Sequence, residues 1–240
     1  MRLPADNPVF CAVDTNSVEA ADHLAHRLAG RVGGLKLGLE FFAAAGPDGI
    51  RRVATHGVPI FLDLKLHDIP NTVAGAVRAV VPLGPAFVTL HAAGGRAMMQ
   101  AAAEAARSEA ARLHRPRPRL LGVTVLTSLD DDDLRAMGRD EPVAQQVDRL
   151  AHLALDAGLD GLVCAATEIA HLRRRFGREP TLMVPGIRPA WSGADDQKRV
   201  TTPAEAMAAG ADFLVIGRPI TRATDPADAA RRVREELVAN

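Results

Sequence analysis

The chain has 240 residues, 48 % of them hydrophobic, which suits one large domain with a sizeable buried core. Its 29 basic residues balance its 29 acidic residues, so no overall charge attracts nucleic acid or a membrane surface. Because the N-terminus carries no long apolar segment, we expect neither a signal peptide nor a membrane span. Cys11 and Cys164 stand far apart in apolar runs and are expected to be reduced core thiols of a cytoplasmic protein.

Short apolar runs alternate with stretches of helical periodicity along the whole chain. The runs, rich in Val, Ile, Leu and Phe, predict strands buried on both faces at residues 9–13, 32–37, 59–64, 86–90, 120–125, 161–164, 182–184 and 213–216. Helices are predicted at residues 17–29, 39–56, 69–81, 95–111, 143–157, 167–176, 203–209 and 226–238. Ser17 is the expected N-cap of the first helix, and Gly46–Pro47 should interrupt the second. The charged stretches 115–119 and 130–133 are expected to be solvated loops.

This alternation predicts an α/β protein, and eight units can close into a single (β/α)8 TIM barrel spanning residues 1–240. An open doubly wound sheet is the rival architecture. No GxGxxG motif follows the first predicted strand, which weakens the dinucleotide-binding version of that rival.

Polar or charged residues stand at the carboxyl ends of almost all the predicted strands. They are Asp14, Lys36, Asp63 with Lys65, His91, Thr127 with Ser128, Arg188, and Gly217 with Arg218. In a (β/α)8 barrel these ends converge on one mouth, where active sites are found. For any one of them taken alone, an ordinary loop residue is the better explanation, but that explanation does not suit seven of eight strands together.

The densest cluster is the run DLKLHDIPNT at residues 63–72. Asp63 and Lys65 are two apart on a predicted strand, so their side chains should point to the same side, with Leu64 on the other. Lys36 can add a second cation and Asp68 a second anion, and such alternation favours the charged form of every member. The alternative is a structural salt-bridge network without catalytic meaning.

The loops after the seventh and eighth predicted strands form a second cluster, with sequences VPGIR at 184–188 and FLVIGRPI at 213–220. Barrels often hold a phosphate there, using backbone N–H groups and a glycine that permits close approach. Arg188 and Arg218 can clamp a dianion. The alternative is that both are solvated surface arginines.

The run DLKLHDIPNT resembles the signature of the orotidine 5′-phosphate decarboxylase family. Further similar segments are AVD at 12–14, LKLG at 35–38, VTVLTS at 123–128, PGIRP at 185–189, DDQKR at 195–199 and IGRPI at 216–220. The resemblance covers essentially the whole chain, although related sugar-phosphate enzymes share the DxKxxDI part. It implies decarboxylation of orotidine 5′-phosphate to uridine 5′-phosphate and CO2, the last step of de novo UMP synthesis, without cofactor or metal.

The resemblance also implies residue roles. Lys65 protonates ring carbon C6, Asp63 lies against the departing carboxylate, and Lys36 and Asp68 complete a Lys-Asp-Lys-Asp array. The family works as a homodimer in which the partner chain supplies Asp68 and Thr72. The remaining implied substrate contacts are Asp14 and Thr72 at the ribose, Thr127 and Ser128 at the pyrimidine, Arg188, Gln197, Gly217 and Arg218 at the phosphate, and Ile69 and Pro185. For His91 a supporting role and plain packing stay equally open.

Residues 188–199, with a bend at Gly193, are the candidate lid over the mouth. Two rival functions remain. One is a Mg²⁺-dependent sugar-phosphate decarboxylase or aldolase of the same superfamily, which would want an acidic metal ligand where Lys36 stands. The other is a non-catalytic barrel that binds a phosphate ligand, for which a broken charge array is expected.

Overall fold

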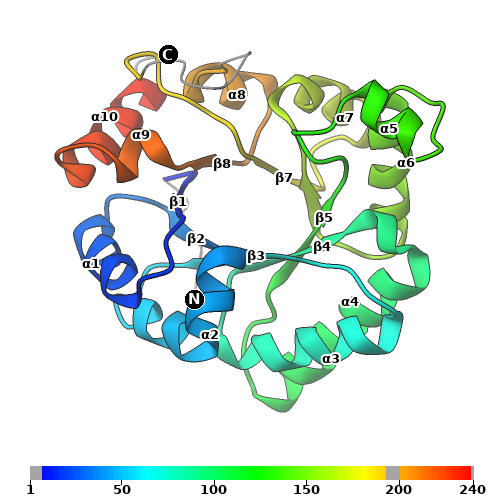
Figure 1. The fold of residues 1–240 in the computed structure, drawn as a ribbon, viewed down its shortest axis with the longest axis horizontal. Coiled ribbons are helices and arrows are strands. Elements are labelled where there is room, and N and C mark those ends of the chain that lie inside the picture. Colours follow the sequence, from blue (N-terminus) through cyan, green and yellow to red (C-terminus); the bar gives the residue numbers. More distant parts are fainter. Residues whose placement is uncertain (1–6, 193–200, 239–240) are drawn as a thin grey trace.

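Eight parallel strands close into a barrel in the order of the sequence, with β8 pairing back onto β1 (Figure 1). The strands are β1 (Val9–Val13), β2 (Gly34–Gly38), β3 (Ile60–Leu66), β4 (Phe87–His91), β5 (Arg119–Val123), β6 (Gly161–Val163), β7 (Thr181–Val184) and β8 (Phe213–Ile216). This computed structural model describes residues 7–192 and 201–238. The predicted (β/α)8 barrel is confirmed.

Helices form a ring outside the strands (Figure 1). They are α1 (Val18–Leu28), α2 (Leu39–Ala54), α3 (Pro70–Val80), α4 (Arg96–Arg112), α5 (Asp131–Ala136), α6 (Val143–Asp156), α7 (Ile169–Phe176), α8 (Pro203–Ala209), α9 (Arg218–Thr221) and α10 (Pro226–Val238). In the part of the chain that the structure describes, none of them is long and apolar enough to cross a membrane.

Local sequence signals explain where several helices begin and bend. The Ser17 hydroxyl accepts the N–H of Ala20 at 3.1 Å, as expected for the N-cap of α1. Gly46 has a φ of 56° and a ψ of −160°, so α2 is kinked one residue before Pro47, where the sequence predicted an interruption.

The acidic run at 130–133 was predicted to be a loop, and this is wrong. Asp130 instead caps α5, because its carboxylate accepts the N–H groups of Asp132 and Asp133, and Asp133 caps Asp130 in return. Carboxylates in a first helical turn also interact favourably with the helix dipole. These acidic residues therefore initiate a helix.

Aromatic side chains fill the end of the barrel opposite the polar strand ends. The rings of Phe10, Phe61, Phe87 and Phe213 meet edge to face, with centroids 5.2 to 6.2 Å apart. A Cβ at Gly34 would come within 2.0 Å of the Phe10 ring, so a glycine on β2 makes room for this cluster. We call these four phenylalanines the aromatic floor of the barrel. They leave the opposite end for polar side chains.

Candidate active site

The polar strand ends meet around a pocket of about 200 Å³ at the mouth of the barrel. Five of the predicted site residues line it: Lys36, Asp63, Lys65, Thr127 and Pro185. Phe61, from the aromatic floor, is also part of its wall. The fold therefore brings polar residues from several strand ends together at one mouth, as the sequence predicted.

Four charged groups form a continuous chain across this mouth. Lys65 Nζ lies 2.7 Å from Asp63 Oδ2, and Lys36 Nζ lies 3.9 Å from the same oxygen. Lys36 Nζ also donates to Asp14 Oδ1 at 3.1 Å. The Lys36 and Asp63 side chains are only 13 % and 11 % exposed, so little water screens their attraction. The alternating charges predicted for Lys36, Asp63 and Lys65 are thus in direct contact.

The backbone of β3 departs from regular strand geometry at the lysine. Lys65 has a φ of 48°, in the left-handed region that a side chain with a Cβ rarely adopts. The register of β3 against β4 shifts between Leu62 and Leu66. Simple strand alternation therefore does not account for the Lys65–Asp63 contact, although it correctly predicts that Leu64 is buried on the other side.

Thr89 on β4 was not among the predicted site residues, yet it joins Asp63 to Lys65. Its hydroxyl accepts the backbone N–H of Lys65 and donates to Asp63 Oδ1, both at 2.9 Å. The residue is fully buried. A polar residue inside the apolar run FVTLH was the available signal.

The rest of the pocket wall is apolar. It is made by Val123, Val125, Leu126, Val163, Cys164 and Val215. Burial raises the pKa of the Cys164 thiol far above its ordinary value, so this wall carries no charge. The sequence analysis named none of these apolar residues as a substrate contact, because an apolar side chain at a strand end has the same sequence pattern whether it faces a helix or a ligand.

The residues expected to act across an interface are exposed at the same mouth. Asp68 and Thr72 are exposed, and no ion pair joins Asp68 to any residue that the structure describes. Its carboxylate accepts the N–H of Ile69 at 2.6 Å. Ile69 is 67 % exposed and Leu39, which follows β2, is 58 % exposed. The single chain therefore brings together Lys36, Asp63 and Lys65 but not Asp68.

The loops after β7 and β8 hold the predicted phosphate residues. Arg188 is only 4 % exposed, and its N–H donates to the Thr201 carbonyl at 3.1 Å. Gly217 precedes α9, which begins at Arg218. A Cβ at Gly217 would lie 3.3 Å from the Ala12 Cβ and 4.0 Å from Asp14 Oδ2, so this glycine is next to the charge chain. Gln197, and the Gly193 bend of the candidate lid, lie outside the described residues.

Two further predicted residues, Ser128 and His91, do not line the pocket. Ser128 is exposed, one residue beyond Thr127. The His91 ring is half-buried, with its centroid 5.5 Å from that of His67. Burial, together with the charges of His67 and Lys65, lowers the pKa of His91, which favours the neutral ring.

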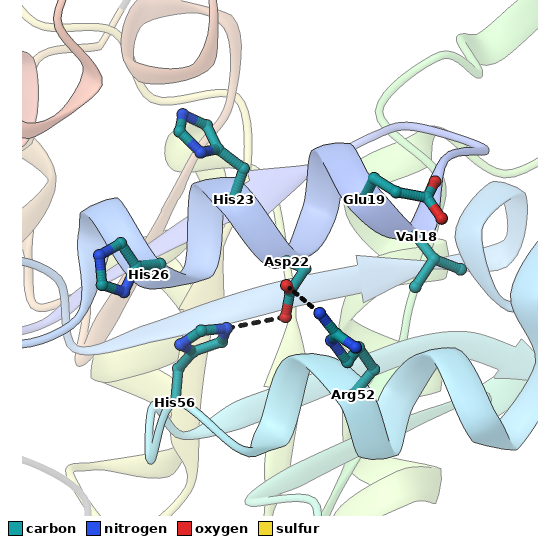
Figure 2. Close-up of a pocket in the computed structure, with 7 residues that line it drawn as sticks. All are labelled: Val18, Glu19, Asp22, His23, His26, Arg52 and His56. Carbon is teal, nitrogen blue, oxygen red and sulfur yellow. Dashed lines mark hydrogen bonds and ion pairs between the residues drawn. The ribbon is translucent and has the colours of Figure 1, made fainter.

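A larger hollow of about 500 Å³ lies elsewhere, between α1 and α2 on the outside of the barrel (Figure 2). Asp22 pairs there with His56 at 2.8 Å and with Arg52 at 2.9 Å. No strand end contributes to it, so it is separate from the candidate site. Neither hollow, nor any other place among residues 7–192 and 201–238, gathers three His, Cys, Asp or Glu side chains that could hold a metal ion.

Comparison with known proteins agrees with the sequence resemblance. The family model described as "Orotidine 5'-phosphate decarboxylase / HUMPS family" matches residues 7–233. The orotidine 5′-phosphate decarboxylase of Rhodospirillum rubrum is 60 % identical, covering 99 % of this chain and 97 % of that protein. The Moorella thermoacetica protein of the same name is 51 % identical, covering 99 % of this chain and 94 % of that protein.

Solved structures extend the similarity to the fold. The orotidine 5′-phosphate decarboxylase of Lactobacillus acidophilus superimposes with a TM-score of 0.85 at 37 % identity, covering 97 % of this chain and 99 % of that one. The barrel, the charge chain at its mouth and the full-length similarity lead to one conclusion: this chain belongs to the orotidine 5′-phosphate decarboxylase / HUMPS family.

Proposed function

We propose that the chain decarboxylates orotidine 5′-phosphate to uridine 5′-phosphate and CO2, and that Lys36, Asp63 and Lys65 carry out the chemistry. The observation that carries the proposal is the Lys–Asp–Lys contact in a small, largely apolar pocket at the barrel mouth. Relatives that are 60 % and 51 % identical bear the name of this activity, which supports it further.

The chemistry asks for electrostatic stabilisation. Loss of CO2 from ring carbon C6 leaves an electron pair in an in-plane orbital that the ring does not delocalise well. A fixed ammonium beside that carbon stabilises the developing negative charge, most effectively where water is excluded. The Lys65 ammonium then gives its proton to C6, and the pair becomes the new C–H bond. Asp63, placed against the substrate carboxylate, destabilises the ground state by like-charge repulsion.

The pocket geometry suggests how the substrate is oriented. The valines of β5, β6 and β8 suit the faces of a pyrimidine ring, and Thr127 and Pro185, which line the same pocket, together with the neighbouring Ser128 are the proposed contacts to its polar edge. Asp14, held by Lys36, suits a ribose hydroxyl. Gly217 is next to Asp14, so a ribose bound at Asp14 would direct its phosphate toward the loops after β7 and β8. The proposed phosphate contacts are Arg188, Gly217, Arg218 and Gln197. Phosphate contacts remote from C6 would then provide binding energy for closure of the site.

The proposed active unit is a homodimer in which the partner chain supplies Asp68 and Thr72. In support, both residues are exposed in the single chain, and the apolar side chains of Ile69 and Leu39, which follow β3 and β2, are exposed as well. A second copy covering them would bring an anion to the two lysines. The proposal includes a reducing compartment such as the cytoplasm, because both Cys11 and Cys164 are buried free thiols.

A Mg²⁺-dependent sugar-phosphate enzyme remains the second candidate, because the resemblance includes a motif that such enzymes share. That chemistry needs a carboxylate ligand at the second strand. Lys36 stands there with its ammonium 3.9 Å from Asp63, and a cation in this place repels a divalent metal.

The test is to mix the purified protein with orotidine 5′-phosphate and EDTA and to follow the loss of substrate absorbance. Turnover is expected without added cofactor and unchanged by the chelator. The Lys65→Ala variant should retain its fold and lose nearly all turnover. A variant that keeps more than about a tenth of the rate, only about 1.4 kcal/mol of lost stabilisation, would show that Lys65 is not the acid. Inactivation by EDTA that Mg²⁺ reverses would favour the second candidate.

A further inference from the structure

The end of β3 contains a local conflict that one side chain on the neighbouring strand resolves. Lys65 holds a left-handed backbone although it is not a glycine, and the β3–β4 register shifts at this point. Such a conformation persists only when surrounding contacts determine it. The contact in question is the hydrogen bond from the Lys65 N–H to the Thr89 hydroxyl, at 2.9 Å.

The same hydroxyl also sets the orientation of the carboxylate. Asp63 is an acceptor and the Lys65 N–H is a donor, so the group between them must accept and donate at once, as a hydroxyl does. Thr89 donates to Asp63 Oδ1, which leaves Oδ2 directed at Lys65 Nζ, 2.7 Å away. Threonine is branched at Cβ, which restricts the side-chain torsion that aims this hydroxyl.

We infer that Thr89 is a positioning residue for the decarboxylation, holding the Lys65 backbone and the Asp63 carboxylate in the geometry that places the ammonium at C6. The inference rests on the proposed roles of Asp63 and Lys65. Thr89 is fully buried and does not line the pocket, so it acts on the reaction only through these two residues. The phosphate and pyrimidine contacts are made by other loops and should survive its loss.

The central experiment compares Thr89→Val with Thr89→Ser. Valine keeps the shape and removes the hydroxyl, so kcat should fall by at least about 30-fold, because small misplacements of reacting groups produce losses of this order. KM for orotidine 5′-phosphate should rise by no more than about threefold, since the proposed phosphate and pyrimidine contacts are kept. Serine restores the hydroxyl and should keep kcat within about fivefold of the wild type.

The matched control is Thr181→Val, which removes a buried hydroxyl at the opposite end of the barrel, where it accepts a hydrogen bond from Arg119 at 3.2 Å. It should lower the unfolding midpoint and leave kcat unchanged. If Thr89→Val does not fold, Thr89→Cys replaces it, because a thiol of similar size is a weak donor and acceptor, and kcat should fall between the valine and serine values.

The inference is overturned if Thr89→Val keeps kcat within about threefold, if serine is as slow as valine, or if the Thr181 control loses as much kcat. Lys65→Ala distinguishes this failure from that of the proposed function. If Lys65→Ala is active, the proposed role of the lysine itself is refuted. If Lys65→Ala is inactive while Thr89→Val is fully active, only the role of Thr89 is refuted.

Discussion

The Lys65 side chain is the proposed proton donor, and the Lys65 backbone is strained. The effect on activity and the effect on stability can be measured separately. A left-handed φ costs a residue with a Cβ roughly 1–2 kcal/mol, and glycine is exempt. Lys65→Gly should therefore be more stable to urea than Lys65→Ala, by about 1 kcal/mol, although both are inactive.

Lys36 provides the matched comparison for this prediction, because it lies within the regular strand β2 and pairs in register with both neighbours. There the order should reverse, with the alanine variant more stable than the glycine variant by about 0.5–1 kcal/mol. If glycine and alanine rank the same way at both positions, the strain at Lys65 does not contribute to stability.

Arg218 tests the phosphate assignment. In Arg218→Ala, kcat/KM for orotidine 5′-phosphate should fall at least about tenfold, because phosphate binding energy assists formation of the closed site. The nucleoside orotidine, which lacks the phosphate, should be turned over almost equally by variant and wild type. Arg222→Ala, an exposed arginine just after α9, is the control and should behave as wild type. Equal damage to both substrates would refute the phosphate role of Arg218.

At this scale the sequence predicts charged site residues better than neutral ones. Asp63 and Lys36 are conspicuous because a charge in a buried strand needs a reason, and the structure brings them together. Thr89 and Cys164 were missed because a threonine or cysteine inside a strand is equally compatible with simple packing. Which side of the backbone Lys65 faces depends on a register shift that no local pattern encodes.

At the scale of elements, charged residues also secure the end of the barrel away from the site. Asp160, before β6, accepts the N–H of Leu120 and both terminal nitrogens of Arg117. Asp212, before β8, repeats this with the N–H of Leu182 and the guanidinium of Arg173. In both cases a carboxylate accepts the N–H group of the second residue of the preceding strand, so these charges are structural.

The pair α1 and α2 is joined by Asp22, which accepts hydrogen bonds from Arg52 and His56 (Figure 2). The hydrogen bond from Arg52, followed by that from His56, lowers the pKa of Asp22 from 3.8 to about 2. A carboxyl group with a depressed pKa stabilises the fold above its unfolded pKa, and this contribution is lost as the pH falls through its folded pKa. The Asp22 contribution should therefore be complete above pH 4 and decline toward pH 2.

The measurement is the urea midpoint of wild type and Asp22→Asn at about pH 6 and about pH 3. Asn should lower the midpoint at the higher pH, and the difference should shrink at the lower one. Asp48→Asn is the control, because its partner Arg51 is on the same helix and the Asp48 side chain is 94 % exposed. A difference for Asp22→Asn that is the same at both pH values would contradict the assignment.

Element positions were predictable because periodicity and capping are local properties. The Ser17 cap and the Gly46–Pro47 kink stand where the pattern indicates. Element ends were less so: β3 runs to Leu66 because its last residues pair with β4 across a shifted register. The α5 helix was missed because it has few apolar residues and depends on side-chain caps.

At the scale of the whole molecule, the proposed shared site can be tested by complementation. Lys65→Ala and Asp68→Ala should each be nearly inactive alone. After unfolding together and refolding, random pairing makes about half the dimers mixed, and each mixed dimer has one site with both lesions and one with neither. About a quarter of all sites should then be active. Mixed dimers that form without recovery of activity would place Asp68 in its own chain's site.

The aromatic floor made by Phe10, Phe61, Phe87 and Phe213 determines how substrate and products enter and leave the barrel. These rings are packed edge to face, and Phe61 is also part of the pocket wall, so aromatic side chains close the barrel on the side of the pocket away from the mouth. Substrate, CO2 and nucleotide product must therefore all enter or leave through the mouth of the barrel. Product has to depart before the next substrate enters, and uridine 5′-phosphate should therefore act as a purely competitive inhibitor whose departure rate sets the upper limit of turnover.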